Sequence, residues 1–434
     1  MKKLLAMALA LLMVAVLLPV TAMAEELTDY VTVSGIAGCE NKKYASFAAA
    51  YAEIKPVVES LGLGQESATN EDFDALFTDC DSSGNATLTY TITGNVIYDE
   101  ASCANLLTMG RKASHYSGER HLINFKFVGG SNDKTRDTLV VNSDITLPYE
   151  WWGEDIVTSI SFENLTIKGS NVNGLFPYQP YFEGINFKVD NCKLEGIKIY
   201  NCSNVKGSYT ITNNILDGTG AGTEAYAIHL QGHQTEPLTI NISGNTISGY
   251  ARGINIDQKT ANATISNNTI KDLNGITKNG NTYGSAIQLT GGKDLTVINN
   301  TIDVNVANAI HFHNAMTTMP NSITISNNNI KAPYLLWNEA NVPQNLITSA
   351  GNTLDITYPG EAMTKTEVIN SETRIEGTAV NKPIVIIVPD DSTDTTTTTE
   401  KPANPATGAN DFVGAAAALA AVSLLGMAAI TRKK

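Results

Sequence analysis

Four polar residues recur at one position of a repeated segment and are the first candidates for chemistry. Each follows Ile in a segment that reads small residue, Ile, polar residue, large apolar residue; the four are His229, Asn255, Gln288 and His311. Alternation along a strand turns the isoleucines inward and these side chains outward. Two residues farther on, the same face carries Gln231, Asp257, Thr290 and His313. Because imidazole titrates near neutrality, His311 and His313 are candidate catalytic bases, with Asp257 as the carboxylate of the set.

A repeated segment that ends in Asn must position these side chains. An alternating strand, an Asn and a second short apolar strand recur every 23 to 32 residues, and periods of about 20 to 50 residues are typical of stacked repeats. Asn tolerates left-handed backbone angles, and its amide can hydrogen-bond to the same amide one coil away. We therefore expect one file of stacked asparagines: Asn164, Asn191, Asn214, Asn245, Asn268, Asn300, Asn328 and Asn352.

The isoleucines that precede the polar positions form a second file of similar period. This file comprises Ile228, Ile254, Ile287 and Ile310, with Leu335 as its expected next member. Two files that agree in period predict a parallel β-helix, whereas an antiparallel sandwich or a propeller would need more hairpin turns than the chain offers. Neighbouring coils lie about 4.8 Å apart, so Gln288 and His311 would touch, while His229 would lie roughly 14 Å from His311.

Residues 122–356 thus resemble the right-handed parallel β-helix of the pectin and pectate lyase superfamily. We expect an all-β chain with a helical N-terminal cap, because residues 44–61 place apolar side chains at helical spacing before the strand pattern of residues 87–92. A cap is needed since an open coil end is an exposed sheet edge. The expected organisation is a leader and cap region over residues 25–120, the β-helix over 121–356 and further capping strands over 357–390.

The resemblance implies where a ligand would bind. Enzymes of that superfamily carry their sites on the first strand of each coil, which by phase is the strand that bears His311. The long excursions over residues 217–224 and 271–284 would wall the same groove. Since aromatic rings stack on sugar faces, the expected substrate-binding side chains are His229, Gln231, Asn255, Gln288, Tyr283 and Trp337.

Catalysis has less support in the sequence than binding. A glycoside hydrolase needs two carboxylates about 5 to 9 Å apart, and Asp257 is the single one in the outward files. A lyase needs a base and neutralisation of a uronate, for which Lys198 and Arg252 are candidates without an Asp cluster around them. The leading hypothesis is a glycan- or surface-binding, adhesin-like protein; a polysaccharide lyase or glycoside hydrolase, and a passive stalk, are the alternatives.

A short acidic loop in the leader region suggests calcium. Asp79, Asp81 and Ser83 place oxygens at alternate positions before Gly84, which resembles the start of an EF-hand loop. The loop lacks the Glu that would complete such a site, because Tyr90 stands there. A polar helix-to-strand turn explains the same residues. Calcium is the one cofactor that the sequence suggests.

Both ends of the chain read as processing signals. Residues 1–24 combine two lysines, an apolar run and a small-residue cleavage site, as in a secretory signal; a retained membrane helix is the alternative. A Thr- and Pro-rich linker over residues 391–407 leads to an apolar span and basic tail over 408–434. The pentapeptide before the span is Asn404, Pro405, Ala406, Thr407 and Gly408.

Pentapeptide, span and tail resemble the cell-wall sorting signal of Gram-positive surface proteins, although the usual first residue is Leu rather than Asn404. The resemblance implies that a sortase cysteine attacks the Thr407–Gly408 bond and that the Thr407 carboxyl passes to a peptidoglycan amine. A plain C-terminal transmembrane anchor is the alternative. Both predict an extracellular β-helix, attached to the cell wall or the plasma membrane.

Charge and cysteine content restrict the partners. The 43 acidic residues outnumber the 29 basic ones, for a net charge of −14, which excludes a basic nucleic-acid-binding face. The expected ligand is therefore a glycan or another cell-surface ligand. The five cysteines are an odd number without metal-binding spacing, so their pairing stays open.

Overall fold

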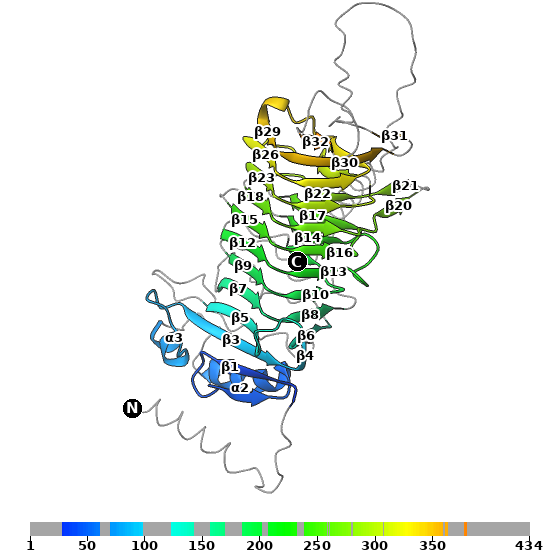
Figure 1. The fold of residues 1–434 in the computed structure, drawn as a ribbon. Coiled ribbons are helices and arrows are strands. Elements are labelled where there is room, and N and C mark those ends of the chain that lie inside the picture. Colours follow the sequence, from blue (N-terminus) through cyan, green and yellow to red (C-terminus); the bar gives the residue numbers. More distant parts are fainter. Residues whose placement is uncertain are drawn as a thin grey trace, which may run out of the picture.

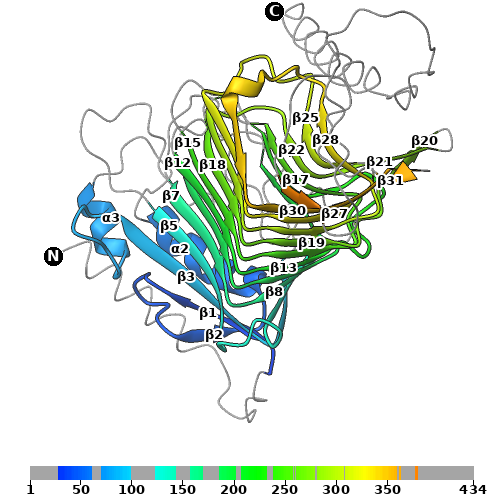
Figure 2. The ribbon, with the colours of Figure 1, turned by 45° about the horizontal axis from the view of Figure 1, so that its top comes forward.

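The computed structural model describes residues 28–60, 70–98, 123–142, 157–169, 185–201, 207–231, 238–257, 259, 261–278, 281–306, 308–358, 361–362 and 377–379. In these parts the chain is a stack of short strands that form three long, mostly parallel sheets (Figure 1). The fold is a parallel β-helix, as the repeat predicted. Viewed obliquely from the C-terminal end, the three sheets are the walls of the coil (Figure 2).

Sheet 1 carries the strand that precedes each Asn turn. Its order is β2 (Lys42–Tyr44), β1 (Tyr30–Ser34), β3 (Ala86–Thr93), β5 (Ile123–Gly129), β7 (Val157–Glu163), β9 (Ile185–Asp190), β12 (Gly207–Thr212), β15 (Leu238–Ser243), β18 (Ala261–Ser266), β23 (Asp294–Ile298), β26 (Ser322–Ser326) and β29 (Ile347–Ala350). From β3 onward the neighbours are parallel, so the stack already begins at Ala86. That start lies within the region predicted to be the leader, upstream of the predicted boundary at residue 121.

Sheet 2 carries the short strand that follows each turn. Its order is β31 (Glu361–Ala362), β30 (Asn352–Tyr358), β27 (Asn329–Ala332), β24 (Thr301–Asp303), β19 (Thr269–Lys271), β16 (Thr246–Ser248), β13 (Ile215–Asp217), β10 (Lys193–Glu195), β8 (Thr166–Gly169), β6 (Thr138–Val141) and β4 (Asn95–Tyr98), and β32 (Gly377–Ala379) pairs with β30.

Sheet 3 closes the coil on the third side and carries the candidate residues. Its order is β11 (Ile199–Asn201), β14 (Tyr226–Gln231), β17 (Arg252–Asp257), β22 (Ser285–Leu289), β25 (Asn308–Phe312) and β28 (Tyr334–Asn338). Before β22, the excursion over residues 271–284 forms an antiparallel hairpin of β20 (Ile276–Lys278) and β21 (Asn281–Tyr283) that projects from the coil (Figure 1).

The core is a set of inward files, one for each apolar position of the repeat. The predicted isoleucine file lies in register through sheet 3, and its next member is Leu336 rather than the predicted Leu335. This one-residue shift turns Trp337 outward. Toward the N-terminus the file in sheet 1 is aromatic, and the rings of Phe127 and Phe162 stack 4.9 Å apart.

A cap closes the N-terminal end of this core. Helix α2 (Phe47–Ser60) lies over the first coil (Figure 1), close to the helix predicted over residues 44–61. Phe47 is fully buried, with its ring centroid 5.5 Å from Tyr90 and 5.8 Å from Tyr98. Helix α3 (Asn70–Leu76) precedes β3, and the 3-10 helix η1 (Gln344–Leu346) precedes β29. The antiparallel strands β1 and β2 cover the edge of sheet 1 that parallel pairing would leave open.

The Asn turns between sheets 1 and 2 use two adjacent residues for two tasks. The first residue takes a left-handed conformation, as in Asn213 with φ 59° and Asn267 with φ 56°. The second is buried, and its amide bonds to the next coil. The buried file comprises Asn214, Asn245, Asn268, Asn300, Asn328 and Asn352. In each link, Nδ2 donates to Oδ1 of the next Asn at 2.9 to 3.0 Å.

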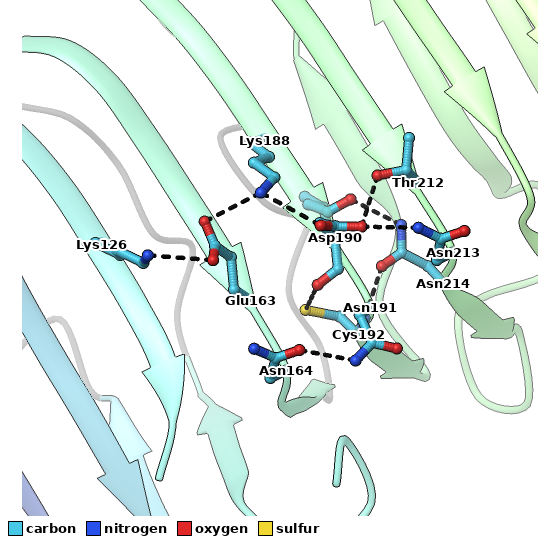
Figure 3. A network of polar contacts seen from close by, with 11 residues as sticks. Lys126, Glu163, Asn164, Lys188, Asp190, Asn191, Cys192, Thr212, Asn213 and Asn214 are labelled. Atoms are coloured by element: carbon cyan, nitrogen blue, oxygen red, sulfur yellow. Dashed lines mark hydrogen bonds and ion pairs between the residues drawn. The ribbon is translucent and has the colours of Figure 1, made fainter. Parts of the chain in front are cut away.

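Asn164 and Asn191 do not belong to this buried file, contrary to the expectation. Both occupy the preceding left-handed position, with φ of 57° and 51°, and their side chains bond to each other at 2.7 Å on the outside. Leu165 and Cys192 take the buried position, and the backbone N–H of Cys192 donates to Oδ1 of Asn214 at 2.8 Å (Figure 3). Where two asparagines are adjacent, one occupies each position. Where a turn has a single Asn, the sequence pattern does not show whether it takes the left-handed position or the buried one.

The outward face of sheet 1 carries a chain of ion pairs in its N-terminal coils (Figure 3). Glu163 pairs with Lys126 and with Lys188, each at 3.2 Å, and Lys188 also contacts Asp190 at 3.3 Å. Asp190 accepts hydrogen bonds from Thr212 and Asn213 in the following coil. These contacts couple four coils along the outside of the stack.

Candidate functional site

The polar residues singled out in the sequence form one straight outward file on sheet 3. Strand register places Tyr200 beside His229, and then successively Asn255, Gln288, His311 and Trp337. Gly253 lets two of these strands approach closely, because a Cβ there would lie 2.1 Å from the carbonyl oxygen of Ala286. The file spans five coil steps, or about 24 Å.

At the N-terminal end of the file, two tyrosine rings flank His229. Its ring centroid lies 4.9 Å from that of Tyr200 and 5.1 Å from that of Tyr226. The guanidinium of Arg252 stacks 3.7 Å from the centre of the Tyr226 ring. Burial lowers the pKa of His229 to about 3, and the positive charges of Arg252 and Lys198 act in the same direction. His229 is therefore a neutral ring at physiological pH.

A buried hydrogen-bond network fixes the centre of the file. Arg252 donates to the hydroxyl of Tyr226 at 2.9 Å and to the carbonyl of Glu224 at 2.7 Å, and the Tyr226 hydroxyl donates to Oε1 of Gln288 at 2.8 Å. Burial raises the pKa of Tyr226, so its proton stays in place. This part of the network links β14, β17 and β22.

The other end of the Gln288 amide continues the network. Its Nε2 donates to Thr290 at 3.1 Å, and the Thr290 hydroxyl donates to Oδ1 of Asn255 at 3.0 Å. Gln288, Thr290 and Asn255 are 7%, 6% and 4% exposed. These three side chains form the polar floor of the file, and each is hydrogen-bonded within the protein.

At the C-terminal end, His311 is held between a carboxylate and an indole. Its Nε2 lies 3.0 Å from Oε2 of Glu339, and its ring stacks on Trp337 at 4.2 Å with a 3° angle between the planes. Asn314 donates to the other oxygen of Glu339 at 2.9 Å. The contacts with Glu339 and Trp337 fix the orientation of His311, which is 4% exposed.

The protonation states of His311 and Glu339 follow from their burial and from the hydrogen bond that they share. Burial lowers the pKa of His311, and the Glu339 carboxylate opposes this only in part. Burial acts to raise the pKa of Glu339, but the hydrogen bond from His311 and the contacts with His313 and Asn314 hold it below the usual value. The pair is therefore an ionised carboxylate that accepts Nε2–H from a neutral imidazole.

His313 lies beside this pair but faces a different partner. Its ring centroid is 5.1 Å from that of His311, and its Nδ1 accepts the backbone N–H of Ala315 at 3.1 Å. Burial and His311 lower the pKa of His313 to about 4. At neutral pH its proton is therefore on Nε2, pointing away from the Ala315 turn.

The remaining predicted residues are placed apart from His311. Gln231 and Asp257 are register neighbours of each other on β14 and β17, whereas Tyr283 lies on the β21 hairpin strand. Glu339 was missed, although it occupies the same phase as Asp257 and His313, two residues after Trp337. Extending the outward file by one more coil would have identified it.

This placement argues against a two-carboxylate hydrolase on the described face. Asp257 and Glu339 stand three coils apart, which is about 14 Å along the stack. Retaining and inverting glycosidases need about 5 to 9.5 Å between their carboxyl groups. Arg252, the candidate for charge neutralisation in a lyase, stacks on Tyr226 and bonds within the network. On the described part of sheet 3, Asp257 and Glu339 therefore do not form a two-carboxylate pair, and Arg252 is engaged within the protein.

The acidic loop of the leader region is a turn stabilised by its own backbone. Oδ1 of Asp81 accepts the N–H groups of Ser83 and Asn85 at 2.8 and 2.9 Å, and Asp79 contributes its backbone carbonyl to Thr87. Among the described residues, which include this loop, no three His, Cys, Asp or Glu side chains converge as metal ligands. The calcium site predicted at Asp79, Asp81 and Ser83 is therefore not supported.

Predictions for the two ends of the chain lie outside the described residues. These are the signal peptide over residues 1–24, the sorting pentapeptide Asn404 to Gly408 and the apolar span within 408–434. In the part that the structure covers, no helix is both long and apolar enough to cross a membrane. Cys39, Cys80 and Cys192 are free thiols there.

One family model matches the stacked coils. Residues 162–353 match the family described as periplasmic copper-binding protein (NosD). Neither the curated proteins nor the solved structures provide a significant match to the chain. The match agrees with the β-helix architecture of this region.

The described side chains do not fit a copper site of the kind that this family name suggests. In the ranges given above, no three His, Cys, Asp or Glu side chains converge as metal ligands. His311 directs Nε2 to Glu339, while His313 uses Nδ1 for the Ala315 amide. One nitrogen of each of these two imidazoles is thus engaged in a hydrogen bond within the protein.

Proposed function

We propose that this chain is an extracytoplasmic surface protein whose sheet 3 binds a neutral glycan without cleaving it. The observation that carries the proposal is the outward file from Tyr200 to Trp337, with aromatic rings at both ends of a polar floor. Ring faces separated by about 24 Å suit an extended oligosaccharide better than a compact small molecule. Such rings bury apolar sugar faces, while polar groups along the rim orient them.

Charge favours an uncharged glycan over a uronate polymer. His229 and His311 are neutral in the folded protein, and Arg252 is committed to Tyr226 and Glu224. Glu339 is ionised and would repel an anion at the Trp337 end. The net charge of −14 acts in the same direction.

Location outside the cytoplasm is supported from two sides. Residues 1–24 have the pattern of a secretory signal, and the matching family is described as periplasmic.

Attachment to peptidoglycan through a sortase, or to the membrane through residues 408–434, is the further proposal from the C-terminal pattern. Mass spectrometry of muramidase-released protein tests it: wall attachment predicts a C-terminal peptide that ends at Thr407 joined to a cross-bridge amine. An intact chain in the membrane fraction would instead support the plain anchor.

Affinity electrophoresis of the purified full-length chain tests glycan binding. Gels would contain soluble galactomannan, laminarin or hydroxyethylcellulose, with polygalacturonate as the charged comparison. We expect retardation in at least one neutral gel, weakened roughly 3- to 10-fold by Trp337→Ala or Tyr200→Ala, since one aromatic contact contributes about 0.5 to 1.5 kcal/mol. Tyr30→Ala, on the N-terminal cap, is the matched control.

Two outcomes would replace the proposal. New reducing ends, or the ultraviolet absorbance of unsaturated uronate, would establish a hydrolase or a lyase. Absence of retardation in every gel would leave the stalk as the better description.

A further inference from the structure

The outward face of sheet 1 changes character along the stack. In the N-terminal coils its central file reads Lys126, Ser161 and Lys188, and these lysines join the ion pairs described above. From β12 onward, register places Thr210, Asn241, Thr264, Thr296, Thr324 and Thr348 in the same file. The file thus passes from charged to uncharged groups at β12.

The two flanking files repeat this uncharged chemistry. In coils β12 to β26 they carry Ser, Thr and Asn at most positions: Ser208, Thr239, Asn262 and Ser322 on one side, and Thr212, Ser243, Ser266 and Ser326 on the other. Asp294 is the one charged residue in these files, and Ser322 donates to it at 2.9 Å. Apart from Asp294 and Ile298, the flanking positions of these coils carry hydroxyl or amide groups.

The central threonine hydroxyls are available to a partner. Within the described residues, Thr264, Thr296 and Thr324 make no side-chain hydrogen bond, whereas Ser208 and Thr212 bond to Asn186 and Asp190. The three threonines are partly exposed. A hydroxyl supplies one donor and two acceptor lone pairs, so these three consecutive coils present the same group at a spacing of about 4.8 Å.

Sheet 2 shows that threonine files alone are not unusual in this fold. Thr246, Thr269 and Thr301 also lie in register and face outward. Thr269 and Thr301 share their strands with Lys271 and Asp303, and Asp303 pairs with Lys331 of the next strand. The distinguishing property of sheet 1 is therefore a hydroxyl file in uncharged surroundings.

We propose that the outward face of sheet 1 from β12 to β29 is a second contact surface, which takes a neutral polysaccharide laid across the coils. This protein is strongly acidic, but the central file of sheet 1 carries no charge from β12 onward, and this favours an uncharged partner there. The central file of five threonines and Asn241 spans about 24 Å, with one hydroxyl or amide group for each coil, which suits an extended, repeating polyol. The ligand class rests on the proposed function, but the surface does not.

Adsorption of the full-length chain to insoluble neutral polysaccharide tests this surface. The probes are acid-swollen cellulose and insoluble mannan, and the variant is the triple change T264V/T296V/T324V. Val keeps the β-branched shape that suits a strand while removing three hydroxyls. We expect at least tenfold weaker adsorption. The matched control, T246V/T269V/T301V on sheet 2, should stay within twofold of the unmodified chain.

The outcomes separate this proposal from the one for sheet 3. The sheet 1 surface would be overturned if the two triple variants adsorbed equally well, whether or not both adsorbed less than the unmodified chain. Preferential adsorption of the unmodified chain to a polyanionic resin would also overturn it. A chain that is retarded in soluble glycan gels through Trp337 but does not adsorb retains only the sheet 3 site. A chain that adsorbs through the threonines without retardation retains only the sheet 1 surface. Circular dichroism establishes that both triple variants are folded.

Discussion

Asn268 donates Nδ2 to Oδ1 of Asn300 at 3.0 Å, and its backbone N–H donates to the same oxygen at 3.0 Å. The same pair of bonds recurs in the links from Asn214 to Asn352. Nδ2 of Asn268 also donates to the carbonyl of Ile242 at 2.9 Å. Each amide therefore joins three coils, and the file acts as a polar seam inside an apolar core.

Replacement of Asn268 by Leu should strongly destabilise the stack. It leaves the buried Asn245 amide, the Ile242 carbonyl and part of Asn300 unsatisfied, at about 1 to 3 kcal/mol for each such group. We expect a loss of about 3 to 5 kcal/mol in the free energy of unfolding, measured by urea denaturation. Asn267→Gly is the control, because Gly accepts the φ of 56°; comparable losses in both variants would contradict the seam.

Cys192→Asn should extend the seam by one coil. Oδ1 of Asn214 accepts the N–H of Cys192 at 2.8 Å, whereas the later amide oxygens each accept a second bond from the preceding Nδ2. An Asn side chain at 192 would supply that second bond, so we expect about 1 kcal/mol of added stability. Cys192→Ala is the comparison variant. A Cys192→Asn protein no more stable than Cys192→Ala would show that the coil cannot accommodate the amide.

Stability should fall as the pH drops below about 6.5, the usual pKa of histidine. Burial lowers the pKa of His229 to about 3 and of His313 to about 4, and it also lowers that of His311. Between these values and 6.5 the unfolded chain binds more protons than the folded one, so acid favours unfolding. His229→Phe retains ring contacts with Tyr200 and Tyr226 but cannot titrate. Urea midpoints at pH 7 and pH 4.5 should therefore differ less in this variant than in the unmodified protein.

Glu339→Gln should lower the pKa of His311 further. The carboxylate is the group that favours the protonated imidazole, through its charge and its 3.0 Å hydrogen bond. Gln keeps the size of the side chain and removes the charge. Proton NMR of the His311 ring as a function of pH measures the effect. Asn314→Ala is the comparison variant, because it removes a hydrogen bond to Glu339 and leaves the carboxylate charge in place. An unchanged titration in Glu339→Gln would mean that the two groups are not coupled.

The repeat was readable because a solenoid needs the same side chain at the same position in every coil. Two files of similar period predicted parallel stacking, and the outward phase of His229, Asn255, Gln288 and His311 followed from alternation. The sequence alone could not distinguish the two residues of the turn where a single Asn occurs. Asn164 and Asn191 were therefore assigned to the buried file, which Leu165 and Cys192 occupy.

The sequence by itself determined the coil, its register and the face on which the polar residues stand, because these depend on a local period. Tertiary structure alone decided the partners: that Arg252 reaches Tyr226, that Tyr226 reaches Gln288, and that His311 meets Glu339 from the next coil. These contacts join residues 26 to 62 positions apart. They depend on the packing of long side chains from neighbouring coils in one buried, poorly solvated layer. The period of the repeat does not encode this packing.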